Sequence, residues 1–193
     1  MMIGNPNFFA IESEIAKASE RLSQMALGYF VLHITGRCYG VRQLDATMLG
    51  CSFIEVGRRI ARRGSHNAPF PFDAGAAEIA HAFRRALYNF CEDDETFFGM
   101  DQAQFAYEVH SKWLTWAPDG DEAFDDGSYV LQIDFEDRVR LIAFRSSEDG
   151  LFDPESLGDV SISQDDFYGI LQDWKDKFVT EWESIPKVFV KNS

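Results

Sequence analysis

Cysteine is scarce in this sequence, whose 193 residues include only Cys38, Cys51 and Cys91. The number is odd and no two of them form a C-x-x-C pair, which argues against a disulfide framework and against a cysteine-rich zinc site. We therefore expect buried thiols in a reducing compartment, where cysteine acts as a small apolar side chain.

Long apolar runs are also missing. No stretch approaches the roughly 18 apolar residues that would indicate a membrane-spanning helix. The first residues, Met1 to Pro6, contain neither the basic region nor the apolar region of a signal peptide. Both absences predict a cytoplasmic protein with no membrane partner.

Basic residues are few: 18 Lys and Arg face 32 Asp and Glu, for a net charge of −14. This balance disfavours nucleic acid as a partner, because its phosphates would be repelled. The excess of acidic residues lies in the second half. Residues 1–90 carry 10 basic and 7 acidic side chains, whereas residues 91–193 carry 8 basic and 25 acidic ones. The acidic half is either a surface that keeps the protein soluble or a face that attracts a basic partner.

The common catalytic and cofactor motifs are absent as well. The sequence contains no phosphate-binding glycine loop and no G-x-S-x-G nucleophile elbow. Glu78 and His81 have the spacing of a helical di-metal site, but no second pair accompanies them. The segment 119–127 has the composition of a calcium loop, yet Asp126 stands where that loop needs glycine. We therefore expect no cofactor and no metal ion.

Apolar residues make up 46% of the chain, with 18 Phe, 6 Tyr and 4 Trp, enough to bury the core of one domain over residues 1–193. Segments with alternating or β-branched patterns predict strands over Phe8–Ile15, Leu27–Thr35, Cys38–Leu44, Phe105–Leu114, Ser128–Phe135 and Arg138–Phe144. Segments with helical period predict helices over Ser52–Arg63, over Ala74–Phe90 and from Ser163 to near Pro186. The polar segments predict loops over Pro118–Gly127 and Ser146–Asp159.

The order of these elements predicts the fold class. It is α+β, a single domain in which an antiparallel sheet of about six strands is covered by about three helices. The segment from Phe105 to Leu114 is ambiguous, since Phe105, Val109 and Trp113 also have helical spacing. In the first helix, Arg58, Arg59, Arg62 and Arg63 are expected to lie away from the apolar stripe, as a solvated face or a complement to the acidic loops.

Three blocks of residues resemble one protein family. The blocks are Met2-Ile3-Gly4-Asn5-Pro6 with Phe9-Ala10-Ile11, then Gly28 to Ile34 with Gly36 and Tyr39, and finally Asp125 to Tyr129 with Val139 to Ile142. Together they are similar to the immunity protein 42 family of bacterial polymorphic toxin systems. The resemblance implies a cytoplasmic protein that binds and neutralises a cognate toxin, with no catalytic residues to carry over.

Charge and resemblance together predict a binding protein that docks through its acidic second half onto a basic toxin, of the kind that acts on nucleic acid. The expected partner-binding residues are the acids and aromatics of two segments: Glu92, Asp93, Asp94, Glu95, Trp116, Asp119, Asp121, Glu122, Phe124, Asp125 and Asp126. Trp116 and Phe124 are expected to be the anchors. The alternative is a hydrolase or small-ligand-binding enzyme with a site built from His110 and carboxylates, which would require a deep pocket where those groups converge.

Overall fold

The computed structural model describes residues 1–20, 26–88, 95–118, 122–147 and 152–188. It contains two sheets, one of six strands and one of four, with four α-helices among the described residues. The predicted α+β class is confirmed, although the strands form two sheets where a single sheet was expected. No helix in the described ranges is long and apolar enough to cross a membrane.

The first sheet is built from the N-terminal residues. Its main strands are β1 (Met2–Asn5), β2 (Phe9–Ser19), β3 (Ala26–Ile34) and β4 (Arg37–Tyr39), antiparallel in that order, with β5 (Thr47–Met48) on β3 and β10 (Lys187–Val188) parallel to β2. The β3–β4 turn has two residues with positive φ, Thr35 and Gly36, as a type I′ hairpin requires. The predicted third strand ends early, because Gly40 (φ +113°) turns the chain away after Tyr39.

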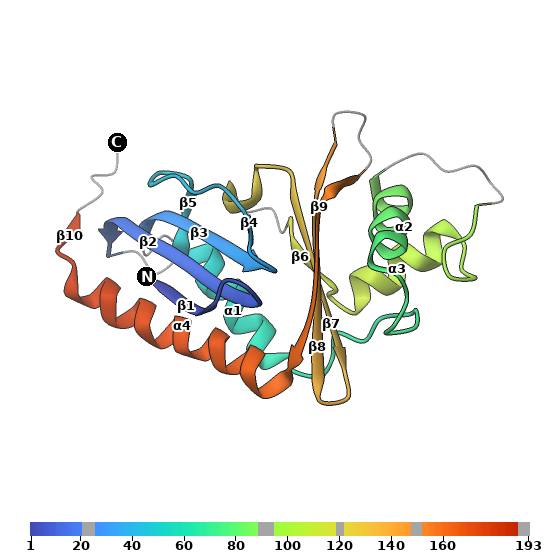
Figure 1. Cartoon of the computed structure of the whole chain (residues 1–193). Helices are drawn as coiled ribbons and strands as arrows, with labels where there is room; N and C mark the ends of the chain where they lie inside the picture. The colour runs from blue at the N-terminus through green and yellow to red at the C-terminus, as the bar shows by residue number, and fades with distance from the viewer. Residues whose placement is uncertain (21–25, 89–94, 119–121, 148–151, 189–193) are drawn as a thin grey trace.

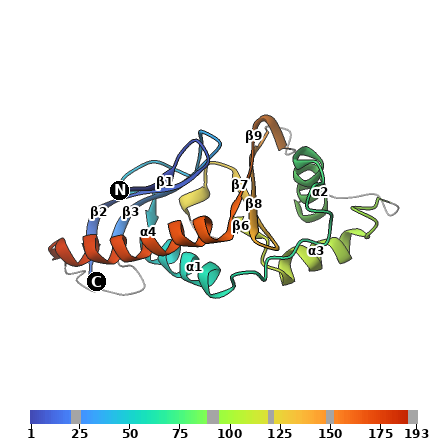
Figure 2. The ribbon, with the colours of Figure 1, turned by 60° about the horizontal axis from the view of Figure 1, so that its bottom comes forward.

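Two helices cover one face of this sheet, α1 (Leu49–Ala61) and α4 (Gln164–Ser184) (Figure 2). The predicted start of the last helix is confirmed, since the Ser163 hydroxyl accepts a hydrogen bond from the Asp166 backbone amide at 3.1 Å. Trp174 and Phe178 are buried against the sheet, and the Trp174 indole donates to the Ser13 hydroxyl at 3.0 Å. The Ser163 cap therefore sets where α4 begins, and its apolar face sets which side packs on the sheet.

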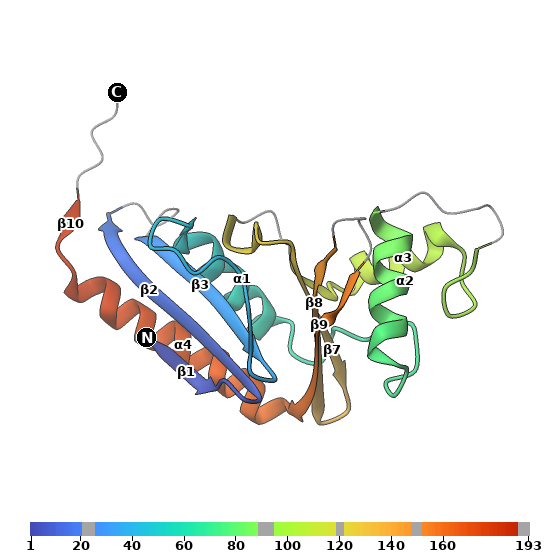
Figure 3. The ribbon, with the colours of Figure 1, turned by 45° about the horizontal axis from the view of Figure 1, so that its top comes forward.

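The second sheet consists of β6 (Thr115–Ala117), β7 (Ser128–Phe135), β8 (Arg138–Ser146) and β9 (Phe152–Ser163). It stands between the first sheet with its helices and a second pair of helices, α2 (Ala76–Tyr88) and α3 (Gln102–Ser111) (Figures 1 and 3). The predicted hairpin β7–β8 is confirmed. Its two faces join different hydrophobic clusters: Val130 and Leu141 pack toward the first sheet, whereas Leu131 and Ile133 pack toward α2 and α3.

Three predictions about this half of the chain are wrong. Phe105–Leu114 is not a strand, because α3 buries Phe105 and Val109 on one face and Asp101 caps it by accepting from the Gln104 amide at 2.8 Å. The predicted loop Ser146–Asp159 is wrong from residue 152 onward, because residues 152–159 belong to the edge strand β9, whose exposure permits its polar residues; residues 148–151 lie outside the described residues. The alternation of Tyr129, Leu131, Ile133 and Phe135 predicts that all four share one buried face of β7, but Phe135 is 47% exposed and stacks on Phe72 instead.

Candidate functional site

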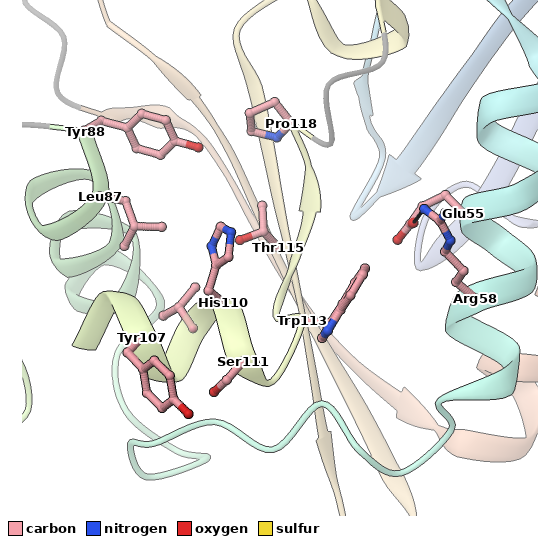
Figure 4. Close-up of a pocket in the computed structure, with 11 residues that line it drawn as sticks. Glu55, Arg58, Leu87, Tyr88, Tyr107, His110, Ser111, Trp113, Thr115 and Pro118 are labelled. Atoms are coloured by element: carbon pink, nitrogen blue, oxygen red, sulfur yellow. Dashed lines mark ion pairs between the residues drawn. The ribbon is translucent and has the colours of Figure 1, made fainter. Parts of the chain in front are cut away.

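A cleft of about 590 Å³ opens between α1, α2, α3 and β6 (Figure 4). We call it the aromatic cleft, and its lining residues are Glu55, Arg58, Leu87, Tyr88, Tyr107, Val109, His110, Ser111, Trp113, Thr115 and Pro118. The lining residues span positions 55 to 118, so the cleft exists only once α2 and α3 have packed on the second sheet opposite α1.

Exposed aromatic rings distinguish this cleft. Tyr107 is 68% exposed, Tyr88 47% and Trp113 39%. Tyr88 is also held in place, because its ring packs on Tyr129 at 5.3 Å between centroids and on Phe83 at 5.8 Å. Large aromatic side chains gathered in a concave, accessible surface are typical of a binding site.

Trp113 occupies an unusual backbone position. The end of α3 is a Schellman motif, in which the Trp113 amide donates to the His110 carbonyl and the Leu114 amide to the Val109 carbonyl, both at 3.1 Å. The residue at Trp113 then needs a left-handed conformation, here φ +54°, which glycine adopts most easily. A tryptophan there is strained, which indicates that its side chain has a role outside the helix end. The Arg62 guanidinium lies 4.0 Å from the ring centroid.

The α1 wall of the cleft is fixed by a buried arginine. Arg59 is 1% exposed and its Nε lies 3.0 Å from Glu55 Oε1. Its two terminal nitrogens donate to the Thr115 carbonyl at 2.6 Å and to Gln132 Oε1 at 3.0 Å. The expectation that all four α1 arginines are displayed away from the core is therefore wrong for Arg59. Its buried charge is matched by Glu55, and it ties α1 to β6 across the base of the cleft.

Behind Arg59, the network continues to a buried carboxylate. The Asp134 carboxylate lies 3.0 Å from His66 Nδ1 and accepts from the Tyr168 hydroxyl at 2.9 Å and the Gly64 amide at 2.7 Å. Burial alone would raise the pKa of Asp134, but the hydrogen bonds from His66 and Gln132 outweigh it and lower that pKa below its usual value. His66 and Asp134 are 0% and 2% exposed, so this pair is inaccessible to a substrate.

The acids predicted to bind a partner have different environments. Asp119, Asp121, Glu92, Asp93 and Asp94 lie outside the described residues. Glu122, in the short 3₁₀ helix η1 (Glu122–Phe124), and Asp125 after it are exposed.

The other two predicted acids make contacts within the fold. Glu95 pairs with Arg85 at 2.6 Å. Asp126 accepts from the Gly40 amide and from Arg145, both at 3.1 Å, and so supports the turn after β4.

The two predicted aromatic anchors lie in the core of this structure. Trp116 is 1% exposed and Phe124 4%. Trp116 packs edge-on against Phe167 at 6.1 Å, and Phe124 does so against Phe30 at 6.3 Å. The accessible rings of the aromatic cleft are instead Tyr88, Tyr107 and Trp113, which the sequence did not indicate. Treating 105–114 as a strand concealed the helix end that presents Tyr107 and Trp113 together.

The features expected of an enzyme do not converge in the cleft. His110 is exposed there, and Figure 4 shows Glu55 on the opposite wall, where its carboxylate is engaged by Arg59. Within the described part of the chain, no ion pair joins His110 to a carboxylate, and no group of three His, Cys, Asp or Glu side chains has metal-binding geometry.

A second groove, of about 460 Å³, lies between the β1–β2 turn and the start of α4. Phe8 is 58% exposed at its edge, Ile162 and Ile170 line it, and Asp165 and Asp173 are among its acids. It shares no lining residue with the aromatic cleft, so it provides a matched surface for comparison.

Comparison with known proteins gives two matches. A family model described as immunity protein 42 matches residues 1–177. Among solved structures, the chain is similar to CdiI from Burkholderia dolosa AUO158, with a TM-score of 0.57 and 19% sequence identity over 92% of this chain and 99% of that one. At this identity the structural match shows a common fold. No curated protein matches the chain.

Proposed function

The chain belongs to the immunity protein 42 family and is therefore an immunity protein that neutralises a toxin; we propose that it acts by forming a stoichiometric complex with a cognate toxin domain, without catalysis. The observation that carries this proposal is the aromatic cleft, an accessible concave surface lined with exposed rings, where His110 pairs with none of the carboxylates that the structure describes. Such a surface suits a protein partner better than a substrate.

Two residues that line the aromatic cleft are followed in the sequence by acidic segments. Tyr88, which lines it, precedes the run from Glu92 to Glu95, and Pro118, which also lines it, is followed directly by Asp119. We propose that the acidic side chains of these segments, together with Glu122 and Asp125, attract a basic toxin surface and speed its association.

The charge of the whole chain supports a basic partner. A toxin that acts on nucleic acid needs basic side chains to hold phosphates, and a chain with net charge −14 is attracted to such a surface while it is repelled by nucleic acid itself. We place the protein in the cytoplasm, where a thiol such as that of Cys38, which forms no disulfide among the described residues, stays reduced.

Binding of the toxin domain encoded next to this protein tests the proposal. Titration calorimetry should give one toxin per chain, and toxin activity should fall in proportion to the complex formed. Residual inhibition at large toxin excess, with turnover of the toxin, would indicate catalysis and contradict it.

Charge reversal tests the acidic segment. Asp121→Lys with Glu122→Lys should slow association at low salt at least tenfold and reduce its salt dependence. The control is Asp173→Lys with Glu183→Lys, which makes the same charge change at exposed positions of α4. If association slows equally in both double variants, only the overall charge matters. If it does not slow in the first, Asp121 and Glu122 do not guide the toxin.

A further inference from the structure

Building on the proposed function, we infer that the aromatic cleft receives a projecting segment of the toxin with a large apolar or aromatic side chain at its tip, and that this contact sets the lifetime of the complex. The shape of the surface is the first argument. The cleft is concave, so its partner must be convex, and 590 Å³ lies within the range of pockets that enclose most of a compact ligand. That is room for the tip of a loop.

The aromatic walls are the second argument. Binding energy at interfaces concentrates in Trp, Tyr and Arg side chains that become fully desolvated. Trp113 is held by Arg62 and Tyr88 by Tyr129 in the free protein, so little conformational freedom remains for these rings to lose when a partner binds. An apolar tip between them would bury surface that now faces water.

Polar groups at the cleft are the third argument. The Thr115 hydroxyl oxygen is buried and makes no hydrogen bond within the described residues, a state that buried polar groups rarely keep. The Arg58 side chain is 59% exposed, and its nearest carboxylate oxygen, on Glu55, is 3.8 Å away. The exposed Arg58 guanidinium can donate to backbone carbonyls of an entering segment, whereas the buried Thr115 hydroxyl is reached only if neighbouring side chains move.

The backbone at Trp113 is the fourth argument, and it separates folding from binding. Glycine would relieve the left-handed conformation there, which offsets the loss of the tryptophan's contact with Arg62. The tryptophan side chain contributes to the cleft wall. Trp113→Gly should therefore change stability little while it weakens toxin binding.

The sequence next to the lining residues indicates that the occupant is a segment of the toxin domain. Two acidic segments flank it in the sequence, which favours a tip with basic residues around it. Charge then governs the association rate, whereas the buried tip governs the dissociation rate, as is usual for protein complexes.

The test compares dissociation rates of the toxin domain from full-length variants. Trp113→Gly and Tyr107→Ser should each raise the rate about 30-fold or more, the loss expected for a hot-spot aromatic residue. Phe8→Ser is the matched control, because Phe8 is equally accessible but lies on the second groove, and its rate should remain within twofold of wild type. The melting temperature of Trp113→Gly should stay within about 3 °C of the wild type or rise.

The outcomes separate this inference from the proposed function. If the wild type binds the toxin and both cleft variants dissociate at the wild-type rate, the cleft inference is wrong and the immunity function stands. If Phe8→Ser is the variant that dissociates rapidly, the toxin occupies the second groove. If the wild type does not bind the toxin domain, the proposed function itself is wrong.

Discussion

Helix α1 and the residue that caps its C-terminus each place an arginine over a tryptophan, and the two pairs differ in their surroundings. Arg59 lies 4.9 Å from the ring of Trp116, and both residues are 1% exposed. Arg62 lies 4.0 Å from the ring of Trp113, which is 39% exposed at the aromatic cleft. The two arginines are three residues apart in the chain, and so are the two tryptophans. The same arginine–tryptophan contact therefore occurs once in the core and once at the surface.

The difference teaches which contacts serve the fold and which remain available to a partner. The inner pair is linked to Glu55, Thr115 and Gln132, so any change there leaves buried polar groups unpaired. The outer pair is partly exposed, and its Trp113 lines the cleft that Tyr88 and Tyr107 also line. We therefore expect stability to depend on the inner pair and toxin binding on the outer one.

The largest expected effect follows from breaking the inner pair. Arg59→Met removes the charge that matches Glu55 and the donors to Thr115 and Gln132, which should destabilise the protein by about 3–5 kcal/mol. Urea unfolding followed by tryptophan fluorescence measures the change. A loss below about 1 kcal/mol would mean that the inner pair contributes no more than an exposed one.

A smaller effect is expected from acid, through the network behind the inner pair. The pKa of Asp134 is lowered in the folded protein, so this carboxylate adds stability above its unfolded pKa, near 3.8, and that stability is lost as pH falls through the folded value. Asp134→Asn should therefore reduce the difference in unfolding free energy between pH 6 and pH 3. An unchanged difference would show that the network does not contribute to acid stability.

The smallest effect is expected from the outer pair. Arg62→Ala removes one exposed cation–π contact, which should lower the free energy of unfolding by only about 0.5–1 kcal/mol. The same urea titration measures it beside Arg59→Met. Equal losses in the two variants would remove the distinction between the pairs.

The parts of the fold that the sequence predicted are those where local signals agree. The β7–β8 hairpin shows alternation on both sides of its turn, and α4 combines an apolar stripe with the Ser163 cap. In the segment of α3, the spacing of Phe105 and Val109 fits both a strand and a helix. The helix forms because it packs these side chains against α2 and the second sheet. Strand β9 has the composition of a loop because it lies at a sheet edge.

The site was harder to predict than the fold. The acidic bias of the second half was visible in the sequence, but composition cannot tell an exposed acid such as Glu122 from Asp126, which supports a turn. Nor can it tell Trp113 from Trp116, because burial depends on the packing of α1 against β6. The aromatic cleft draws on residues from Glu55 to Pro118, and only the assembled structure brings them together.

Hydrogen–deuterium exchange of the chain, free and saturated with the toxin domain, tests the central claim most directly. The account predicts slower exchange in residues 55–62 and 102–118, which border the aromatic cleft, and unchanged exchange in residues 5–9 and 165–173, which border the second groove. Protection confined to residues 5–9 and 165–173, with residues 102–118 unchanged, would contradict it.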